Sequence, residues 1–340
     1  MLKGENTISR IGAITMTKSM QRNVLLLTGA GFTHNFGGFL AREMWSKIFN
    51  NPLLQAIPDV RDLLLKDFDF ESVYSIVLTG GRYTPEAKEA VRVAVEDAYK
   101  DLDDSIKGWT FNLENPLALN IYGLGDLLSF LSQRGSESGW FFTLNQDLLM
   151  ERQHDYRSPG VAQVFDYGIK GNAKKAILPK EAEPAKKDLN NSSYIKLHGS
   201  YAWASSNGGN QMVIGKNKSE NISQEPLLKW YMEIFMGQIF EKNKKLLVIG
   251  YGFGDAHIND ILLKGVQEYG LSIYIVNPTD PEIVKNKLEG KPSHFGSWEV
   301  SKYAGIWNGV KGYFPYSLRQ IFPPDQNETT ILKEIKKSLS

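Results

Sequence analysis

Five apolar segments spread along the chain each end in glycine or polar residues. They are LLLTGAG at 25–31, FFTLNQD at 141–147, YIKLHGS at 194–200, LLVIGYGFGD at 246–255 and YIVNPTD at 274–280. A strand buried on both faces is apolar throughout, and such strands are typical of parallel sheets. Helical spacing separates the segments, so strands alternate with helices. The sequence therefore predicts the α/β class, with a doubly wound, Rossmann-like parallel sheet and a helical insertion.

The long stretch between the first two strands predicts the insertion. It shows helical periodicity without a strong strand, and Thr84 followed by Pro85 is a typical start for its longest helix. An ordinary run of crossover helices fits the same periodicity. We expect an N-terminal segment at 1–22, a Rossmann-like domain at 22–50 and 120–325, a helical insertion subdomain at 51–119 and a C-terminal amphipathic helix at 326–340.

Composition limits the classes of function. Lys and Arg number 39 against 38 Asp and Glu, and this net charge of +1 gives no reason to expect direct binding of nucleic acid. The chain has no cysteine, which excludes disulfides, a thiolate nucleophile and Cys-ligated zinc. No apolar run approaches the roughly 20 residues of a membrane span, and the first 23 residues lack the apolar core of a signal peptide. We expect a cytoplasmic protein with no membrane partner.

Gly29 and Gly31 follow the first strand, at the edge where open parallel sheets bind ligands. Glycines there let the backbone approach a pyrophosphate, and the amides of the next helix point at it. A tight structural turn also explains both glycines, because His34 replaces the third glycine of the dinucleotide fingerprint. No acidic residue for a ribose is identifiable about 20 residues further on, which argues against an ordinary NAD dehydrogenase.

Polar side chains at the next two strand ends are candidates for catalysis. Asn145 follows the second strand, where a carboxamide can hold a hydroxyl or a water in a fixed direction. Asp147 is placed to cap the helix after it. His198 ends a buried strand beside a glycine and could act as a general base, since an unperturbed histidine titrates near 6.5. His257, in the first turn of a later helix, could contact the ligand.

Taken together, these segments resemble the sirtuin family. The family has a Gly-Ala-Gly turn after the first strand, here Gly29–Gly31, a Thr-Gln-Asn-Ile-Asp segment, here Thr143–Asp147, and a catalytic His-Gly pair, here His198–Gly199. The resemblance covers roughly 22–50 and 120–280. The chain departs from the deacylating sirtuins in three ways: Leu144 replaces the glutamine, Phe32–His34 replaces their Ile-Ser, and the cysteines of their zinc module are missing.

GYGFGDAHIND at 250–260 and the helical insertion resemble the sirtuin-like proteins of bacterial anti-phage defence. That resemblance implies NAD as substrate, hydrolysed to nicotinamide and ADP-ribose so that the infected cell loses its NAD. It implies Asn145 and His198 as catalytic residues, and neither zinc nor another metal. The NAD-binding residues that it implies are Gly29, Ala30, Gly31, Phe32, Thr33, Asp147, Gly250, Tyr251 and Asn277.

Two other functions remain open, and partners are expected. A protein deacylase of the sirtuin type needs an acyl-lysine cleft and usually the zinc module that shapes it. A non-catalytic module that senses NAD or ADP-ribose needs neither Asn145 nor His198. Because a toxic hydrolase must be restrained until triggered, we expect a homo-oligomer or a trigger protein, and the resemblance implies a hexameric HerA-type translocase ATPase. The C-terminal helix and residues 51–120 are the expected contact surfaces.

Overall fold

The computed structural model describes residues 24–109, 112, 114, 115, 118–132, 139–153, 163, 164, 176, 177, 193–204, 210–292, 298–326 and 328–340. The predicted N-terminal segment at 1–22 lies outside these residues.

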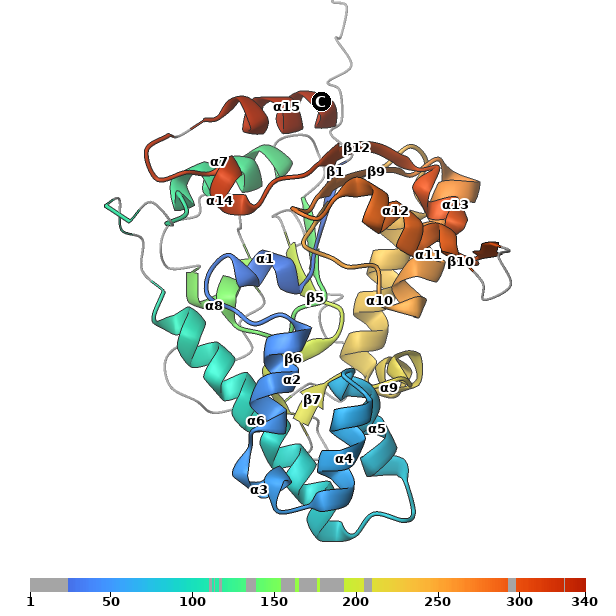
Figure 1. The fold of residues 1–340 in the computed structure, drawn as a ribbon. Coiled ribbons are helices and arrows are strands. Elements are labelled where there is room, and N and C mark those ends of the chain that lie inside the picture. The colour runs from blue at the N-terminus through green and yellow to red at the C-terminus, as the bar shows by residue number, and fades with distance from the viewer. Residues whose placement is uncertain are drawn as a thin grey trace, which may run out of the picture.

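A seven-stranded parallel sheet forms the centre of the described fold (Figure 1). Its strand order is β12-β9-β8-β1-β2-β5-β3, and every neighbouring pair is parallel. The strands are β1 (Val24–Thr28), β2 (Trp140–Thr143), β3 (Gln163–Val164), β5 (Ser193–Lys196), β8 (Lys245–Ile249), β9 (Ser272–Val276) and β12 (Val310–Phe314). The predicted doubly wound α/β class is therefore confirmed.

Short strands outside this sheet form two smaller ones. One pairs β10 (Gly290–Pro292) with β11 (Trp298–Val300), and the other contains β4 (Ala176–Ile177), β6 (Gly199–Ala204) and β7 (Asn210–Met212). Strands β6 and β7 are antiparallel. This second sheet continues directly from the end of β5, so it fixes the loop that carries His198.

Helices cover both faces of the main sheet, which explains why its strands are continuously apolar. Leu26 and Leu247 point to one face and belong to a core that includes residues of α1–α8, α14 and α15. Leu25 and Val248 point to the other face and pack with α9–α13. The first group is α1 (Ala30–His34), α2 (Ala41–Phe49), α3 (Pro52–Gln55), α4 (Pro58–Lys66), α5 (Phe70–Thr79), α6 (Pro85–Lys107), α7 (Ile121–Ser132), α8 (Leu149–Gln153), α14 (Leu318–Ile321) and α15 (Thr330–Leu339). The second group is α9 (Lys218–Gln224), α10 (Pro226–Ile239), α11 (Ala256–Tyr269), α12 (Pro281–Glu289) and α13 (Ala304–Trp307).

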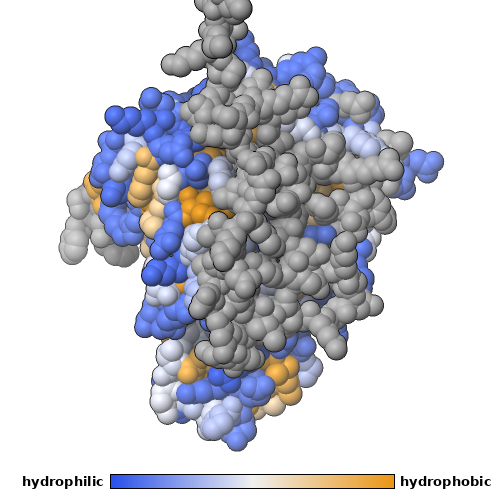
Figure 2. All heavy atoms as spheres, turned by 180° about the vertical axis from the view of Figure 1, so that it is seen from behind, coloured by the Kyte–Doolittle hydropathy of each residue, from blue (hydrophilic) through white to orange (hydrophobic). Residues whose placement is uncertain are grey.

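Helices α2 to α6 form a lobe at the lower end of the molecule in Figure 1. Thr84 caps α6 by accepting a hydrogen bond from the Ala87 amide, and Pro85 occupies its first turn, as the sequence predicts. The lobe shares one apolar core with the sheet. Its outer end exposes Leu53, Leu65 and Phe68, and Figure 2 shows apolar patches at this lower end. The status of 51–119 as a separate subdomain stays a prediction.

The C-terminal helix α15 buries its apolar side, Leu332, Ile335 and Leu339, against the chain itself. Within the described residues, no helix combines the length and the apolar character needed to cross a bilayer.

The strand order places a topological switch point beside β1. The chain passes from β1 to β2 on one side and later returns to β8 on the other side. In open α/β sheets, ligands bind outside the carboxyl ends of strands at such a point. The crevice between the ends of β1 and β8 is therefore the place to look for a site.

Candidate functional site

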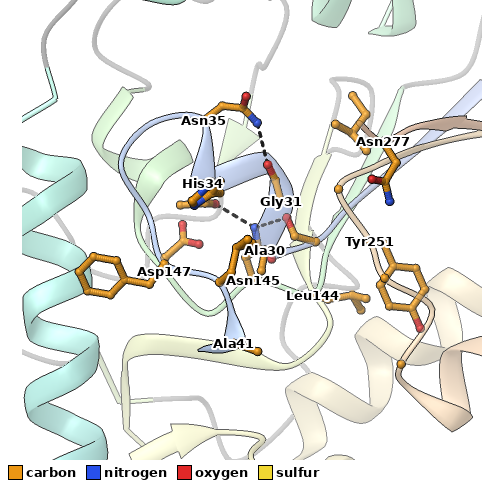
Figure 3. A pocket seen from close by; sticks show the side chains of 18 of the residues that line it. Ala30, Gly31, His34, Asn35, Ala41, Leu144, Asn145, Asp147, Tyr251 and Asn277 are labelled. Carbon is orange, nitrogen blue, oxygen red and sulfur yellow. Dashed lines mark hydrogen bonds between the residues drawn. The ribbon is translucent and has the colours of Figure 1, made fainter. Parts of the chain in front are cut away.

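A cavity of about 780 Å³ opens at the carboxyl edge of the sheet. Its size lies within the range of small-molecule sites. The ends of five strands contribute to it, as the sequence predicts, and Figure 3 shows several of the side chains that face it. The predicted site residues that line it are Gly29, Ala30, Gly31, Thr33, Asn145, Asp147, His198, Gly250, Tyr251 and Asn277.

Phe32 is the predicted site residue that does not line this cavity. Its side chain is buried in the core and packs against Phe36, with ring centroids 5.7 Å apart. Helix α1 is five residues long. One of its sides faces the cavity, and the other packs inward. Any contact of Phe32 with a ligand would have to come from its backbone.

The glycine turn after β1 packs backbone to backbone against the turn after β8. The amide of Gly29 donates to Ile249 O and that of Gly31 to Gly250 O, both at 3.0 Å. A Cβ on Gly29 would lie 2.8 Å from Gly250 O, and one on Gly31 would lie 2.8 Å from the Gly250 Cα. Both positions therefore require glycine for this close packing, whether or not a phosphate binds there. The Gly31 amide thus already donates across to the other turn, and the Phe32 amide donates to Gly29 O within its own turn.

Asn145 lies just beyond β2, beneath this turn (Figure 3). Its Nδ2 donates to Gly29 O and to Thr33 Oγ1, both at 2.9 Å. A carbonyl oxygen can only accept, so the atom facing Gly29 O must be the nitrogen of the amide. Both N–H groups are thereby used, and the remaining Oδ1 can accept a hydrogen bond from a hydroxyl or a water.

Gln146 was not predicted as a site residue, yet it connects four parts of the fold. Its Oε1 accepts from Tyr99 Oη on α6 at 2.6 Å. Its Nε2 donates to His198 O at 3.2 Å and to Val213 O at 2.9 Å. The amide of Tyr201 donates to Gln146 O. Gln146 thus fixes the His198 loop relative to the helical lobe.

Asp147 also lines the cavity, and it caps α8 as predicted. Its Oδ1 accepts from the Leu149 amide at 3.0 Å. The backbone oxygen of Asp147 accepts from Lys196 Nζ, which also pairs with Glu151 at 2.7 Å. The side chains of Lys196 and Glu151 are 2% and 4% exposed, so this ion pair lies inside the protein. This ion pair was not predicted, because Lys196 lies within an otherwise apolar strand and Glu151 is distant from it in sequence.

His198 is buried and lies next to a second histidine. Its Nε2 is 2.9 Å from Nε2 of His257 on α11. Burial lowers the pKa of His198 to about 3, while the Asp255 carboxylate opposes this shift. Burial also lowers the pKa of His257. Both rings are therefore neutral near pH 7, and the unperturbed value near 6.5 does not apply to His198.

Asp255 occupies the N-cap position of α11, but its side chain does not cap the helix. Its Oδ1 pairs with Lys218 Nζ at 2.7 Å, and Lys218 also pairs with Glu71 on α5 at 2.8 Å. Asp255 with the two histidines forms a group of possible metal ligands within 4.8 Å of one another. The ammonium of Lys218 and the His198–His257 hydrogen bond both oppose a cation there. The expectation that the site holds no metal stays a prediction.

Residues 140–295 match the family model of the SIR2-like domain. The chain carries a SIR2-like domain. No curated protein matches the chain significantly. SIR2-like domains use NAD, so this assignment points to an NAD-dependent enzyme.

The matched region of the SIR2-like domain contains Asn145, His198, Gly250 and Asn277. The Gly29–Gly31 turn precedes it in sequence but completes the same cavity. Two other parts of the chain also supply walls to the cavity, and sequence reasoning missed both. They are the helical lobe, through Phe70, Glu71, Tyr99 and Leu102, and the segment after β12, through Tyr316, Ser317, Leu318 and Arg319.

The β8–β9 side of the SIR2-like domain is shaped by Tyr251 and Asn277. Gly250 has φ +66, a conformation that glycine adopts without strain. Tyr251 Oη donates to Asn259 Oδ1 at 3.1 Å, which holds the ring at the cavity wall. The Asn277 Oδ1 accepts from the Thr279 amide at 3.0 Å. The side-chain NH2 of Asn277 is left to donate to a ligand.

Proposed function

We propose that this protein is an NAD+ glycohydrolase that cleaves the nicotinamide–ribose bond to give nicotinamide and ADP-ribose. The observation that carries the proposal is the placement of Asn145 and neutral His198 on one wall of the cavity at the switch point. Both offer acceptor groups, which suits the binding of hydroxyls and the orientation of water.

In the proposed reaction the pyrophosphate of NAD+ lies along the Gly29–Gly31 turn. The adenosine lies toward Gly250, Tyr251 and Asn277. The bond from the anomeric carbon to the nicotinamide nitrogen breaks, and its electron pair goes to nicotinamide, which leaves uncharged. A water adds to the oxocarbenium-like carbon that remains.

Asn145 Oδ1 accepts a hydrogen bond from that water or from a ribose hydroxyl. His198 accepts the proton that the water loses. The ring is neutral near pH 7 and therefore has a lone pair to accept this proton. General base help of this kind is typically worth about 10²–10⁴-fold.

The walls of the cavity favour hydrolysis over deacylation. Tyr99 of the lobe donates a hydrogen bond to Gln146, the neighbour of Asn145. Glu71 of the lobe forms an ion pair with Lys218, which also forms an ion pair with Asp255. The lobe therefore lies over the reacting end, where a deacylase must admit an acyl-lysine. A sensor would not need both Asn145 and His198.

The biological role that we propose is depletion of NAD in the cytoplasm during phage infection, with the chain held in a homo-oligomer or a complex with a HerA-type ATPase. Its support is the resemblance of GYGFGDAHIND at 250–260 to anti-phage proteins. Light scattering of the chain, alone and mixed with such an ATPase from the same genome, tests this assembly.

Chromatography of products formed from NAD+ tests the reaction, with the chain alone and with the ATPase. We expect nicotinamide and ADP-ribose in equal amounts, and a loss of at least about 10²-fold in Asn145→Ala. Asn120→Ala is the matched control, because Asn120 is also buried but is not among the residues that line the cavity. Near wild-type turnover in Asn145→Ala would refute the assignment. Release that requires an acylated peptide would identify a deacylase instead.

A further inference from the structure

Arg319 lines the cavity from outside the matched SIR2-like region. It lies in α14, which follows β12, whereas the family match ends at residue 295. The chain reaches the site here because the amides of Asn277 and Tyr316 both donate to Phe314 O, at 3.2 and 2.8 Å. This pairing brings the segment after β12 to the side of the cavity where we place the adenosine.

The guanidinium of Arg319 has hydrogen-bond donors that the fold does not use. Its Nη2 donates to Asn35 O at 2.9 Å. Its Nε is buried and has no hydrogen-bond partner in the described structure. No other hydrogen bond and no ion pair joins Arg319 to the described residues. The residue as a whole is half-buried, and a guanidinium carries five N–H groups, so a ligand in the cavity can accept from those that remain.

Arg319 is connected to the glycine turn through Asn35. The side chain of Asn35 donates to Gly31 O at 2.7 Å (Figure 3), while its backbone oxygen accepts from Arg319. Lys287 is another cation of the cavity wall, but its Nζ donates to Gly252 O, in the turn after β8. Arg319 is therefore the cation that the structure joins to the turn after β1.

The glycine turn itself has few donors for a pyrophosphate. The amides of Gly29, Gly31 and Phe32 all donate to backbone carbonyls. Each phosphate of the pyrophosphate carries a negative charge, so a ligand bound along this turn needs donors and positive charge from elsewhere. A guanidinium suits this role, because its planar fork can donate to two phosphate oxygens at once.

The acidic side chains of the cavity are already engaged at other positions. Glu71 and Asp255 both pair with Lys218, and Asp147 caps α8. They lie toward the reacting end, where the proposed substrate carries the positive nicotinamide ring. Arg319 has no carboxylate partner among the described residues, so its charge is available to the negative part of the same substrate.

We propose that Arg319 binds the pyrophosphate of the dinucleotide, so that the segment after β12 completes the NAD site. The inference rests on the proposed function and adds a binding residue to it. Arg319 contacts a part of the substrate that does not react, so its loss should raise KM more than it lowers kcat. The product ADP-ribose keeps both phosphates and therefore keeps this contact.

Calorimetric titration with ADP-ribose tests the contact directly. Arg319→Gln removes the charge, and Arg319→Lys keeps the charge without the planar fork. We expect the affinity for ADP-ribose to fall about 10- to 100-fold in the Gln variant, the range typical of a hydrogen bond to a charged group, and to fall less in the Lys variant. Arg92→Gln is the matched control and should bind like wild type, because Arg92 is exposed on α6, pairs with Glu89 and is not among the residues that line the cavity.

A phosphate-free ligand separates a phosphate contact from support of α1, since Arg319 also holds the backbone at the end of that helix. Adenosine should bind wild type and the Gln variant with equal affinity. Added salt should weaken the binding of ADP-ribose to wild type more than to the Gln variant, because salt screens the charge that the variant lacks. A residue that only supported α1 would affect both ligands alike and leave the salt dependence unchanged.

An unchanged affinity for ADP-ribose in Arg319→Gln, or equal losses for ADP-ribose and adenosine, would overturn the inference. A loss confined to 2′-phosphorylated ADP-ribose would also overturn it, because the guanidinium would then lie at the adenosine ribose. These failures appear in the variant only. If wild type neither hydrolysed NAD+ nor bound ADP-ribose, the proposed function would fail, and this inference with it.

Discussion

Gly250→Ala tests whether close backbone packing between two strand ends builds the proposed NAD site. Gly250 has φ +66, and its Cα faces the turn after β1. A Cβ there would lie 2.3 Å from the Phe32 nitrogen and 2.5 Å from the Gly31 carbonyl carbon. Ordinary contacts begin at 3.4 Å, so the two backbones must separate by about 1 Å.

The size of the effect has two sources. An alanine in the left-handed region costs about 1–2 kcal/mol. Overpacking of a well-packed region costs a further 1–3 kcal/mol or so. We therefore expect Gly250→Ala to lower the free energy of unfolding by about 2–5 kcal/mol. The same displacement moves Gly31 and Ala30 at the cavity wall, so ligand affinity should fall as well.

Thermal unfolding with and without ADP-ribose measures both effects, because a ligand that binds the folded state raises its stability. We expect a lower midpoint for Gly250→Ala and a smaller rise on adding ADP-ribose. Gly237→Ala in α10 is the control, since a Cβ there meets nothing within 4 Å and should raise stability by about 0.4–1 kcal/mol. An unchanged midpoint and an unchanged ligand response in Gly250→Ala would refute the packing argument.

The other predictions concern buried charges and pH. Lys196→Met should lower the free energy of unfolding by about 3–5 kcal/mol, because it leaves Glu151 buried and unpaired. The double variant with Glu151→Leu should recover much of this loss in urea denaturation, and no recovery would contradict the pairing. An unfolded histidine titrates near 6.5 and folded His198 near 3, so between these values only the unfolded chain binds the proton and stability falls as the pH falls. His198→Gln removes this dependence on pH. From pH 7 to pH 5 the free energy of unfolding of the variant should therefore rise by about 2 kcal/mol relative to that of wild type. A difference that stays constant with pH would argue against a neutral buried ring.

Much of the fold could be predicted because its signals are local. Continuous apolar strands, the Thr84–Pro85 helix start and the Asp147 cap depend on residues close in sequence. Because the carboxyl ends of parallel strands lie at one edge of a sheet, the sequence also predicted that Asn145, His198 and Gly250 lie at one site. The resemblance implied Phe32 as a site residue, but a short motif does not say which side chains of a five-residue helix face the cavity, and that of Phe32 packs in the core.

The sequence by itself determined the α/β class, the edge of the sheet that carries the site and the residue types available for catalysis. The tertiary structure alone decided the state of those residues, because burial and pairing depend on neighbours distant in the chain. His198 is neutral because the fold removes it from water and places His257, 59 residues away, against its ring. Asn145 presents its oxygen because Gly29 and Thr33 take both of its N–H groups. A hydrogen bond across more than 100 residues leaves no periodic trace in the sequence, so only the folded chain reveals it.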